Sequence, residues 1–262
     1  MAGALHPPIM AAMSGRETSS LVTRGLRLAR IVLHLLHGLL TATLFFPFFP
    51  RARCRQEIRT WSCVLLRILR LQVHVHGTPA RVRPLMLVAN HVSWLDIFAM
   101  NSVNPVRFVA KSEIRRWPVI GLLSASTGTL FIERGRRRDT ARVNGLIAEA
   151  MLEDDVVAVF PEGTTTDGSQ VLRFHSSLLQ PALIADAAVQ PVALRFTHKD
   201  GSLCVDAAYD GDKSLWQSLL QIIARQEMDA HLYFLPLLAK DVPHRRALAD
   251  AAHAAIASRL TR

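Results

Sequence analysis

Beyond residue 70, short apolar runs alternate with longer stretches whose apolar positions recur every three or four residues. The short runs predict strands at residues 71–77, 84–90, 107–113, 129–134, 156–160, 189–196 and 231–238, and a further strand at 203–209. Helical spacing predicts helices at residues 94–103, 139–153, within 175–187, at 214–226 and at 241–260, with Asp139 as an N-cap. Strands that alternate with helices predict an α/β fold, a central mixed sheet flanked by helices.

The first part of the chain has a different pattern. Residues 1–20 are rich in small residues and predict a disordered tail, and no ordinary signal peptide is visible because the apolar region begins too late. Residues 31–50 contain no charged residue, and arginines flank them on both sides. About 20 apolar residues suffice to cross a bilayer, but two histidines and two prolines interrupt this stretch. A transmembrane span and a shallow helical hairpin therefore both remain open.

Residues 55–71 have the periodicity of a basic amphipathic helix. Its apolar face carries Ile58, Trp61, Leu65 and Ile68. Such a helix beside an apolar stretch favours binding to a membrane surface; the alternative is a helix packed on its own domain with solvated arginines. We therefore expect membrane-binding helices over residues 21–71 and an α/β domain over residues 72–262.

The positive charge of the chain is concentrated at its front. The net charge is +10, and residues 1–83 contain 12 Arg but only two acidic residues, Glu17 and Glu57. The remaining residues hold 19 basic and 19 acidic side chains and are neutral. A nucleic-acid-binding protein would more often spread positive charge over its folded surface. A basic segment beside an apolar one instead indicates an anionic membrane surface.

Composition limits the remaining possibilities. Half of the 262 residues are hydrophobic, which suffices for a sizeable core. The cysteines, Cys54, Cys63 and Cys204, form no CxxC pattern, so neither a disulfide framework nor a structural zinc site is expected, and a reducing compartment is favoured. His74 and His76 share one face of a predicted strand, but the sequence suggests no third metal ligand. The chain contains no Gly-rich phosphate loop, which disfavours nucleotide-dependent chemistry.

A histidine and an aspartate follow the predicted strand at residues 84–90. His91 and Asp96 are five residues apart in the stretch VANHVSWLDIF. Five residues along a helix rotate by about 500°, which leaves two side chains roughly 140° apart. The two can meet only if His91 lies in the turn before the helix and Asp96 lies in its first turn, with Ser93 as the N-cap. A carboxylate that orients an imidazole is typical of a general base, although the spacing alone also fits an ordinary turn.

Two further strand ends carry polar residues. Arg134 ends the run TLFIER, and an arginine at a strand end can bind a phosphate. In FPEGTTTDG, the residues Pro161 and Gly163 predict a tight turn from which Glu162 projects. The backbone N–H groups of Gly163, Thr164 and Thr165 could form an anion-binding nest. Each of these features on its own is also typical of a solvated loop.

The order and spacing of these stretches carry more information than any one of them. NHxxxxD, FIxR, FPEGT and VxPVAL resemble the four sequence blocks of the glycerolipid acyltransferase family, in particular the bacterial 1-acylglycerol-3-phosphate acyltransferases. The resemblance runs from about Leu71 to Phe196. It implies that His91 is the catalytic base and that Asp96 assists it.

The resemblance also implies an acceptor site. By similarity, Arg134 and the Glu162–Gly163 turn with Thr164 contribute to binding the acceptor phosphate, and Lys111 occupies a position that resembles another phosphate contact. Two positions depart from the family's pattern: Glu133 replaces an aspartate, and Thr165 replaces an arginine. The lost positive charge at Thr165 leaves the acceptor head group open, and relatives that acylate lyso-ornithine lipid share such a sequence.

The expected function is therefore acyl transfer from acyl-CoA or acyl-carrier protein to the free hydroxyl of 1-acylglycerol-3-phosphate, giving phosphatidic acid. The same chemistry on another lysolipid, such as lyso-ornithine lipid, is the alternative. No cofactor and no metal is expected, and the expected partners are the lysolipid, the thioester donor and membrane lipids. The resemblance implies the cytoplasmic face of a bacterial inner membrane. A non-catalytic membrane-binding protein would leave His91, Asp96, Arg134 and Glu162 without a shared role, and binding to nucleic acid is disfavoured by the neutral charge of the α/β part.

Overall fold

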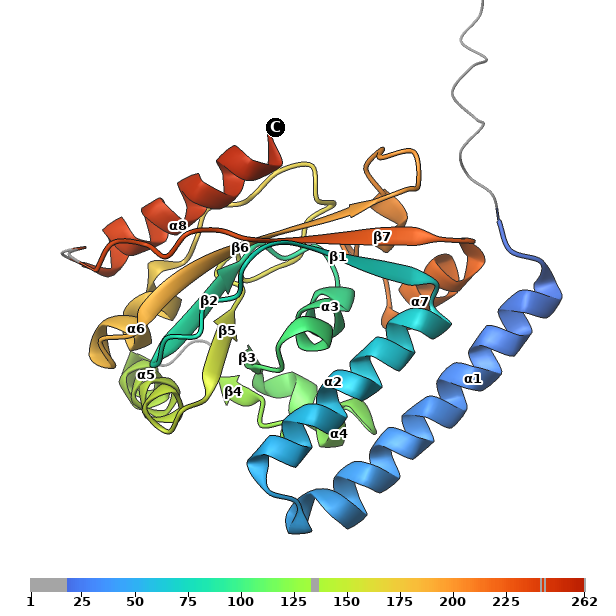
Figure 1. Ribbon diagram of the computed structural model, residues 1–262, viewed down its shortest axis with the longest axis horizontal. Helices are drawn as coiled ribbons and strands as arrows, with labels where there is room; N and C mark the ends of the chain where they lie inside the picture. Colours follow the sequence, from blue (N-terminus) through green and yellow to red (C-terminus); the bar gives the residue numbers. More distant parts are fainter. Residues whose placement is uncertain (1–17, 133–136, 241, 243, 262) are drawn as a thin grey trace, which may run out of the picture.

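A seven-stranded sheet forms the centre of the molecule, in the order β1-β7-β6-β2-β5-β3-β4 (Figure 1). The computed structural model describes residues 18–132, 137–240, 242 and 244–261. The strands are β1 (Leu71–Gly77), β2 (Leu85–Ala89), β3 (Arg107–Lys111), β4 (Leu130–Ile132), β5 (Val156–Val159), β6 (Ala188–Thr197) and β7 (Met228–Phe234). Neighbouring strands are parallel except β6 and β7, which are antiparallel. The predicted mixed sheet is confirmed.

Helices cover both faces of the sheet. They are α1 (Leu21–Leu40), α2 (Arg51–Ile68), α3 (Leu95–Val103), α4 (Ile120–Ser126), α5 (Arg137–Leu152), α6 (Gln180–Ile184), α7 (Leu215–Ala224) and α8 (Arg245–Leu260). One core contains side chains of α1, α2, α3 and α7, and a second core contains those of α5, α6 and α8. Strand β2 contributes Leu85 and Leu87 to the first core and Met86 and Val88 to the second, which explains its uninterrupted apolar sequence.

The structure differs from the predicted elements in several places. Strand β7 is Met228–Phe234 and not residues 231–238. Residues 203–209 are not a strand: Val205–Ala207 form a short 3-10 helix, because the N–H groups of Ala207 and Ala208 bond to carbonyls within the segment and not to a neighbouring strand. Helix α5 begins at Arg137, so Asp139 lies inside the helix and is not its N-cap. The 3-10 helix Ser112–Arg116 and helix α4 were not predicted, since both are too short to show a clear period.

The apolar front of the chain forms a helical hairpin (Figure 1). Helix α1 continues through a π-helical turn, Thr41–Phe45, and a 3-10 turn, Phe46–Phe48, and α2 then runs back beside it. By length and composition, the segment Leu21–Phe48 is apolar enough to cross a membrane. The two helices are joined by His34, whose ring stacks on Trp61 with centroids 4.4 Å apart, and whose carbonyl accepts the Trp61 indole N–H at 3.1 Å. A histidine inside the apolar stretch therefore has a structural role.

The start of α1 is fixed to the turn between α7 and β7. The buried guanidinium of Arg27 donates to the carbonyls of Ile223 at 2.9 Å and Gln226 at 3.3 Å. The Ser19 backbone N–H donates to the Ala224 carbonyl at 2.7 Å. The predicted disordered tail is therefore wrong for residues 18–20, which pack on this turn, and residues 1–17 of that range lie outside the described residues.

Helix α2 packs on its own domain, which is the alternative that the sequence left open. Leu65 and Ile68 are buried in the first core. The Arg59 guanidinium donates to the Ser102 carbonyl of α3 at 3.0 Å, and Arg51 forms an exposed ion pair with Glu153 at 3.1 Å. The C-terminal part of the apolar side of α2 is thus buried in the domain, and membrane binding by residues 21–71 stays a prediction.

Candidate active site

The predicted site residues belong to neighbouring strand ends. Strands β2, β5, β3 and β4 are parallel, so their carboxyl ends meet at one edge of the sheet. His91 follows β2, Glu162 follows β5, and Lys111 is the last residue of β3. The carboxyl edge of a parallel sheet is where α/β proteins place their sites.

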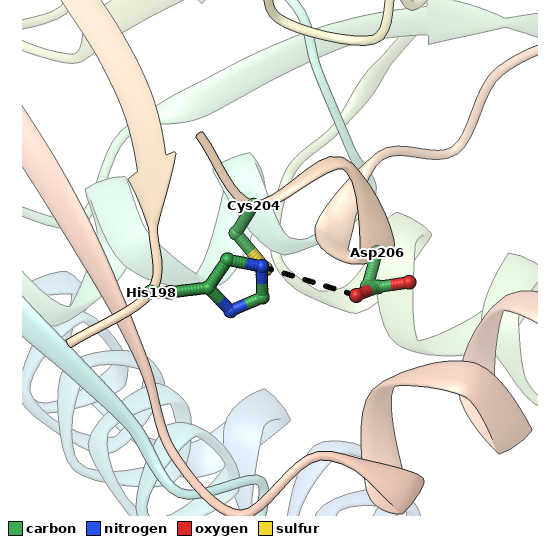
Figure 2. Close-up of side chains that lie close together, drawn as sticks. All are labelled: His198, Cys204 and Asp206. Carbon is green, nitrogen blue, oxygen red and sulfur yellow. Dashed lines mark ion pairs between the residues drawn. The ribbon is translucent and has the colours of Figure 1, made fainter. Parts of the chain in front are cut away.

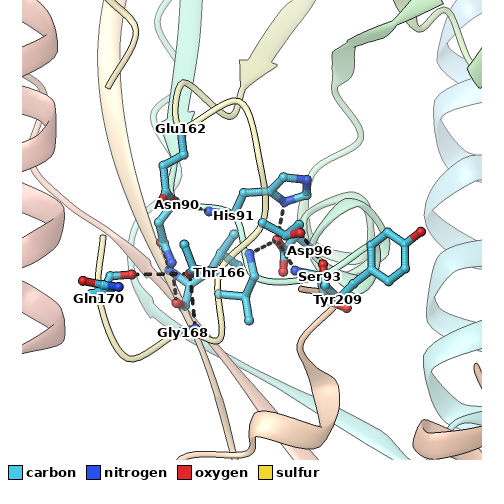
Figure 3. Close-up of polar contacts among 12 residues, drawn as sticks. Asn90, His91, Ser93, Asp96, Glu162, Thr166, Gly168, Gln170 and Tyr209 are labelled. Carbon is cyan, nitrogen blue, oxygen red and sulfur yellow. Dashed lines mark hydrogen bonds and ion pairs between the residues drawn. The ribbon is translucent and has the colours of Figure 1, made fainter. Parts of the chain in front are cut away.

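His91 and Asp96 form the pair that the helical-rotation argument required. The His91 Nδ1 lies 2.7 Å from the Asp96 Oδ2 (Figure 3). A carboxylate only accepts hydrogen bonds, so Nδ1 carries the proton and the lone pair is on Nε2. The Asp96 side chain is fully buried, whereas the His91 side chain is 21 % exposed. The arrangement gives a basic nitrogen that can reach a substrate and a carboxylate that only orients it.

Asp96 also holds the turn between β2 and α3. Its Oδ2 accepts the backbone N–H of Val92 at 2.8 Å and that of Ser93 at 3.0 Å. The predicted N-cap at Ser93 is wrong: the Ser93 Oγ is buried and has no hydrogen-bond partner among the described residues. An aspartate in the first helical turn satisfies these donors more strongly because it carries a charge.

Glu162 points into the protein, contrary to the prediction that it projects from its turn. Only 3 % of its surface is exposed. Its Oε1 accepts the His91 backbone N–H at 2.7 Å (Figure 3). Its Oε2 accepts the Leu172 backbone N–H at 2.7 Å. Burial raises the pKa of Glu162, and the two N–H donors and His91 act against that shift. The carboxylate thus fixes the backbone of the histidine, and its charge would repel a phosphate.

The residues that follow Glu162 also hold the His91 backbone, at its carbonyl group. The Thr166 backbone N–H donates to the His91 carbonyl at 2.9 Å. Gly163 adopts a φ of 73°, a conformation that favours glycine, and its N–H donates to the Phe160 carbonyl at 3.1 Å. This bond removes one donor from the predicted anion-binding nest. The backbone N–H groups of Thr164, which is exposed, and of Thr165 have no acceptor among the described residues.

Of the two predicted phosphate contacts Lys111 and Arg134, the structure describes only Lys111. Lys111 is exposed at the end of β3, at the same sheet edge as His91, and makes no ion pair within the described part of the chain. Arg134 lies outside the described residues. Strand β4, which precedes it, ends at Ile132 on that same edge. The role of Arg134 therefore stays a prediction.

Sequence reasoning overlooked residues that support the pair. The Asn90 side chain donates to the Leu194 carbonyl at 2.9 Å and accepts its N–H at 2.7 Å, so it continues the β2–β6 ladder to the residue before His91. The Tyr209 N–H donates to the Val92 carbonyl at 2.9 Å, and the Thr165 hydroxyl donates to the Tyr209 carbonyl. Asn90 belongs to the NHxxxxD block and could have been found there, but nothing in the sequence marks Tyr209.

One buried cluster contains potential metal ligands. A nitrogen of His198, the thiol of Cys204 and a carboxylate oxygen of Asp206 lie within 4.8 Å of one another (Figure 2). However, Gln221 donates to the Asp206 Oδ1 at 2.8 Å, and the Arg225 guanidinium lies 2.8 Å from Oδ2. A guanidinium on a ligand oxygen opposes a divalent cation, and burial raises the pKa of the Cys204 thiol. These contacts favour a structural ion pair.

The structure also adds a third imidazole to His74 and His76. His231 of β7 stacks on His74, with centroids 4.9 Å apart, and its Nδ1 lies 3.1 Å from the His76 Nε2. The His74 Nε2 is bonded instead to Asp229 at 2.9 Å. The parallel rings do not direct three nitrogens at one point, so we do not assign a metal to this group.

Comparisons with known proteins identify the family of the chain. Residues 72–195 match the family model described as Acyltransferase. The lyso-ornithine lipid O-acyltransferase of Pseudomonas aeruginosa is 36% identical over 203 residues, which cover 77% of this chain and 78% of the relative. The 1-acyl-sn-glycerol-3-phosphate acyltransferase of Neisseria meningitidis is 37% identical over 189 residues, which cover 71% of this chain and 72% of the relative.

The fold has a solved counterpart. The crystal structure of the 1-acyl-sn-glycerophosphate acyltransferase from Thermotoga maritima matches with a TM-score of 0.60 at 20% identity, and the match covers 90% of this chain and 96% of that one. At this identity the similarity bears on the fold alone. The sequence matches carry the family assignment: the chain belongs to the acyltransferase family.

Proposed function

We propose that this acyltransferase moves a fatty acyl group from acyl-CoA or acyl-carrier protein to the free hydroxyl of 1-acylglycerol-3-phosphate. The observation that carries the proposal is the 2.7 Å contact between the His91 Nδ1 and the Asp96 Oδ2, which leaves Nε2 free to accept a proton. The acceptor is the one that the Neisseria relative is named for. The residues fixed around His91 support a reaction without a covalent enzyme intermediate.

The proposed reaction uses few groups. The His91 Nε2 removes the proton of the acceptor hydroxyl, and the oxygen attacks the thioester carbonyl carbon. The carbon–sulfur bond then breaks, and the leaving thiolate takes the proton back from the imidazolium. We assign oxyanion stabilisation to the backbone N–H groups of Thr164 and Thr165, at the end of the FPEGT turn, because they lack acceptors among the described residues. Lys111 and Arg134 are the proposed anchors of the phosphate.

Thr165 supports a second acceptor, lyso-ornithine lipid, which the Pseudomonas relative is named for. The family's pattern has an arginine at this position, whereas the Thr165 hydroxyl here donates to the Tyr209 carbonyl. The site therefore has one cation fewer beside the proposed phosphate. An assay of the purified full chain in detergent, with labelled acyl-CoA and acyl-carrier protein against both lysolipids, tests the proposal. Faster turnover of lyso-ornithine lipid would make it the acceptor in place of 1-acylglycerol-3-phosphate. No turnover of either lysolipid would reject both acceptors.

Replacing Thr165 by arginine should raise the preference for 1-acylglycerol-3-phosphate over lyso-ornithine lipid. An added guanidinium that binds a phosphate contributes about 1.5–3 kcal/mol, so the ratio of kcat/KM values should rise by about tenfold or more. The measurement is kcat/KM for both acceptors. Thr165→Val is the matched control, because it removes the hydroxyl without adding charge and should leave the ratio near that of the wild type. An unchanged ratio in T165R would place the phosphate elsewhere.

We propose further that α1 lies along the membrane surface and does not cross it. Its exposed face carries Val22, Leu26, Leu33, Leu36 and Leu40. At about 100° per residue these positions share one side, opposite to the buried Arg27 and Ile31. Both ends of the α1 segment also pack on the α/β domain, at the α7–β7 turn and at α4. A helix held at both ends by one domain fits an interface, and we place the enzyme on the cytoplasmic face of a bacterial inner membrane.

Replacing Leu33 and Leu36 by glutamate should release the protein from vesicles. The two side chains are 66% and 50% exposed, so the change adds charge to the proposed lipid face without disturbing the core. Each buried leucine contributes roughly 1.5–3 kcal/mol, so affinity for anionic vesicles should fall by at least about a hundredfold. Cosedimentation with such vesicles measures it. Leu146→Glu, an exposed leucine of α5, is the control, and equal binding of all three proteins would contradict the proposed orientation.

A further inference from the structure

One face of the catalytic imidazole is covered by an aromatic ring. The rings of His91 and Phe160 are stacked, with centroids 4.1 Å apart and planes inclined by 12°. Phe108 lies parallel to Phe160 on its other side, at 5.8 Å and 8°. These residues come from β2, β5 and β3 or the turns after them, which are neighbours in the sheet. Three adjacent strands thus build a row of parallel rings that ends at His91.

The stack restrains what the other contacts leave free. Glu162 and Thr166 fix the backbone of His91, and Asp96 fixes Nδ1. A ring held through one nitrogen can still tilt about that hydrogen bond, and tilting moves Nε2, the atom that must accept the proton. A parallel ring at contact distance opposes this motion and keeps water from that face. Small displacements of a catalytic group cost rate steeply, since proton transfer needs alignment.

The stack also favours the charged form of the ring. When His91 accepts the acceptor's proton it becomes an imidazolium, and the face of a phenyl ring attracts a cation. This attraction is stronger for the imidazolium than for the neutral ring, so it acts on the reaction and not on substrate binding.

We propose that Phe160 is a positioning residue of the acyl transfer, holding the His91 ring in its working orientation and stabilising the imidazolium, with Phe108 as its support. The inference rests on the proposed role of His91 as the base. It assigns the phenylalanine of the FPEGT turn a role at the His91 ring itself, whereas the glutamate two residues later acts on the His91 backbone.

The test compares Phe160→Leu with Phe160→Tyr in the purified full chain. Leucine fills the space but lacks a ring, so kcat should fall by roughly ten- to thirtyfold with KM for the lysolipid unchanged. Tyrosine keeps the ring and should restore kcat to within about threefold of the wild type. In NMR spectra of 13C-histidine-labelled protein, the Hε1 resonance of His91 should lose its ring-current shift in F160L and keep it in F160Y.

A matched control separates reaction from structure. Phe174 is buried and packs edge-on against His253, with centroids 5.2 Å apart, and among the described residues its ring makes no stacking contact with His91. Phe174→Leu should lower the Tm much as F160L does, yet leave kcat unchanged. Equal kcat values for F160L and the wild type, or equal losses in F160L and F160Y, would overturn the proposal. Retained activity in His91→Ala would reject the base assignment. Lost activity in H91A together with full activity in F160L would keep the base assignment and reject the role of the stack.

Discussion

Replacing His91 by alanine should lower kcat for acyl transfer by about a thousandfold, which would leave activity near background. General base catalysis contributes roughly 10² to 10⁴ in rate, and no other described imidazole is bonded to the carboxylate of Asp96. The side chain is partly exposed, and Asp96 keeps its backbone donors at Val92 and Ser93, so the fold should persist. Initial rates with labelled acyl-CoA measure the effect, and circular dichroism checks the fold.

The control for this variant is His76→Ala. His76 is exposed on the edge strand β1 and lies away from the His91 turn, so its removal should leave kcat unchanged. Full activity of H91A would show that another group removes the proton. A loss of vesicle binding in H91A would point to a folding defect instead, because the proposed lipid-binding face lies on α1 and His91 lies in the turn after β2.

Replacing Glu162 by glutamine should destabilise the protein as well as slow it. The carboxylate accepts two backbone N–H groups, but a carboxamide offers one oxygen and turns its NH₂ group against the second donor. A buried N–H donor left without its acceptor costs about 1–3 kcal/mol, which corresponds to a Tm decrease of about 2–12 °C for a chain of this size. The His91 backbone also loses its anchor, so kcat should fall. Thermal unfolding of the full chain in detergent measures the stability.

The difference in Tm between the wild type and E162Q should depend on pH. Burial raises the pKa of Glu162 above its ordinary value of 4.5. Between pH 4.5 and the raised pKa, the native state therefore holds more protons than the unfolded state. Wild-type stability from this group is therefore greatest below 4.5 and is lost as pH rises through the raised value. The Tm deficit of E162Q should be largest at the acid end and narrow toward neutral pH. Glu149→Gln, an exposed glutamate on α5, should show no deficit, and a deficit that widens with pH would contradict the sign of the shift.

Particular elements show why some predictions succeeded. β1 and β2 were predicted almost to the residue, because alternation and an unbroken apolar run are direct consequences of which faces are buried. Residues 203–209 have an apolar pattern that is typical of a strand, yet Val205–Ala207 form a 3-10 turn. Among the described residues, this segment pairs with β6 through one isolated bridge, between Thr197 and Leu203. The face of α2 was correctly predicted to be apolar, and in the structure it packs on α1, α3 and the sheet.

The sequence by itself determined the α/β class, the basic apolar front and the identity of the pair, because periodicity and the five-residue spacing from His91 to Asp96 are local properties. Only the tertiary structure decided what the other motif residues do. Glu162 is 71 residues from His91 in the chain, and its direction depends on how β5 is placed beside β2. The same pairing of strands stacks Phe160 on the imidazole. The hydrogen bond from the Thr165 hydroxyl to the Tyr209 carbonyl likewise joins two segments that are distant in the sequence. Contacts between distant segments follow from the packing of the whole sheet, which no window of sequence contains.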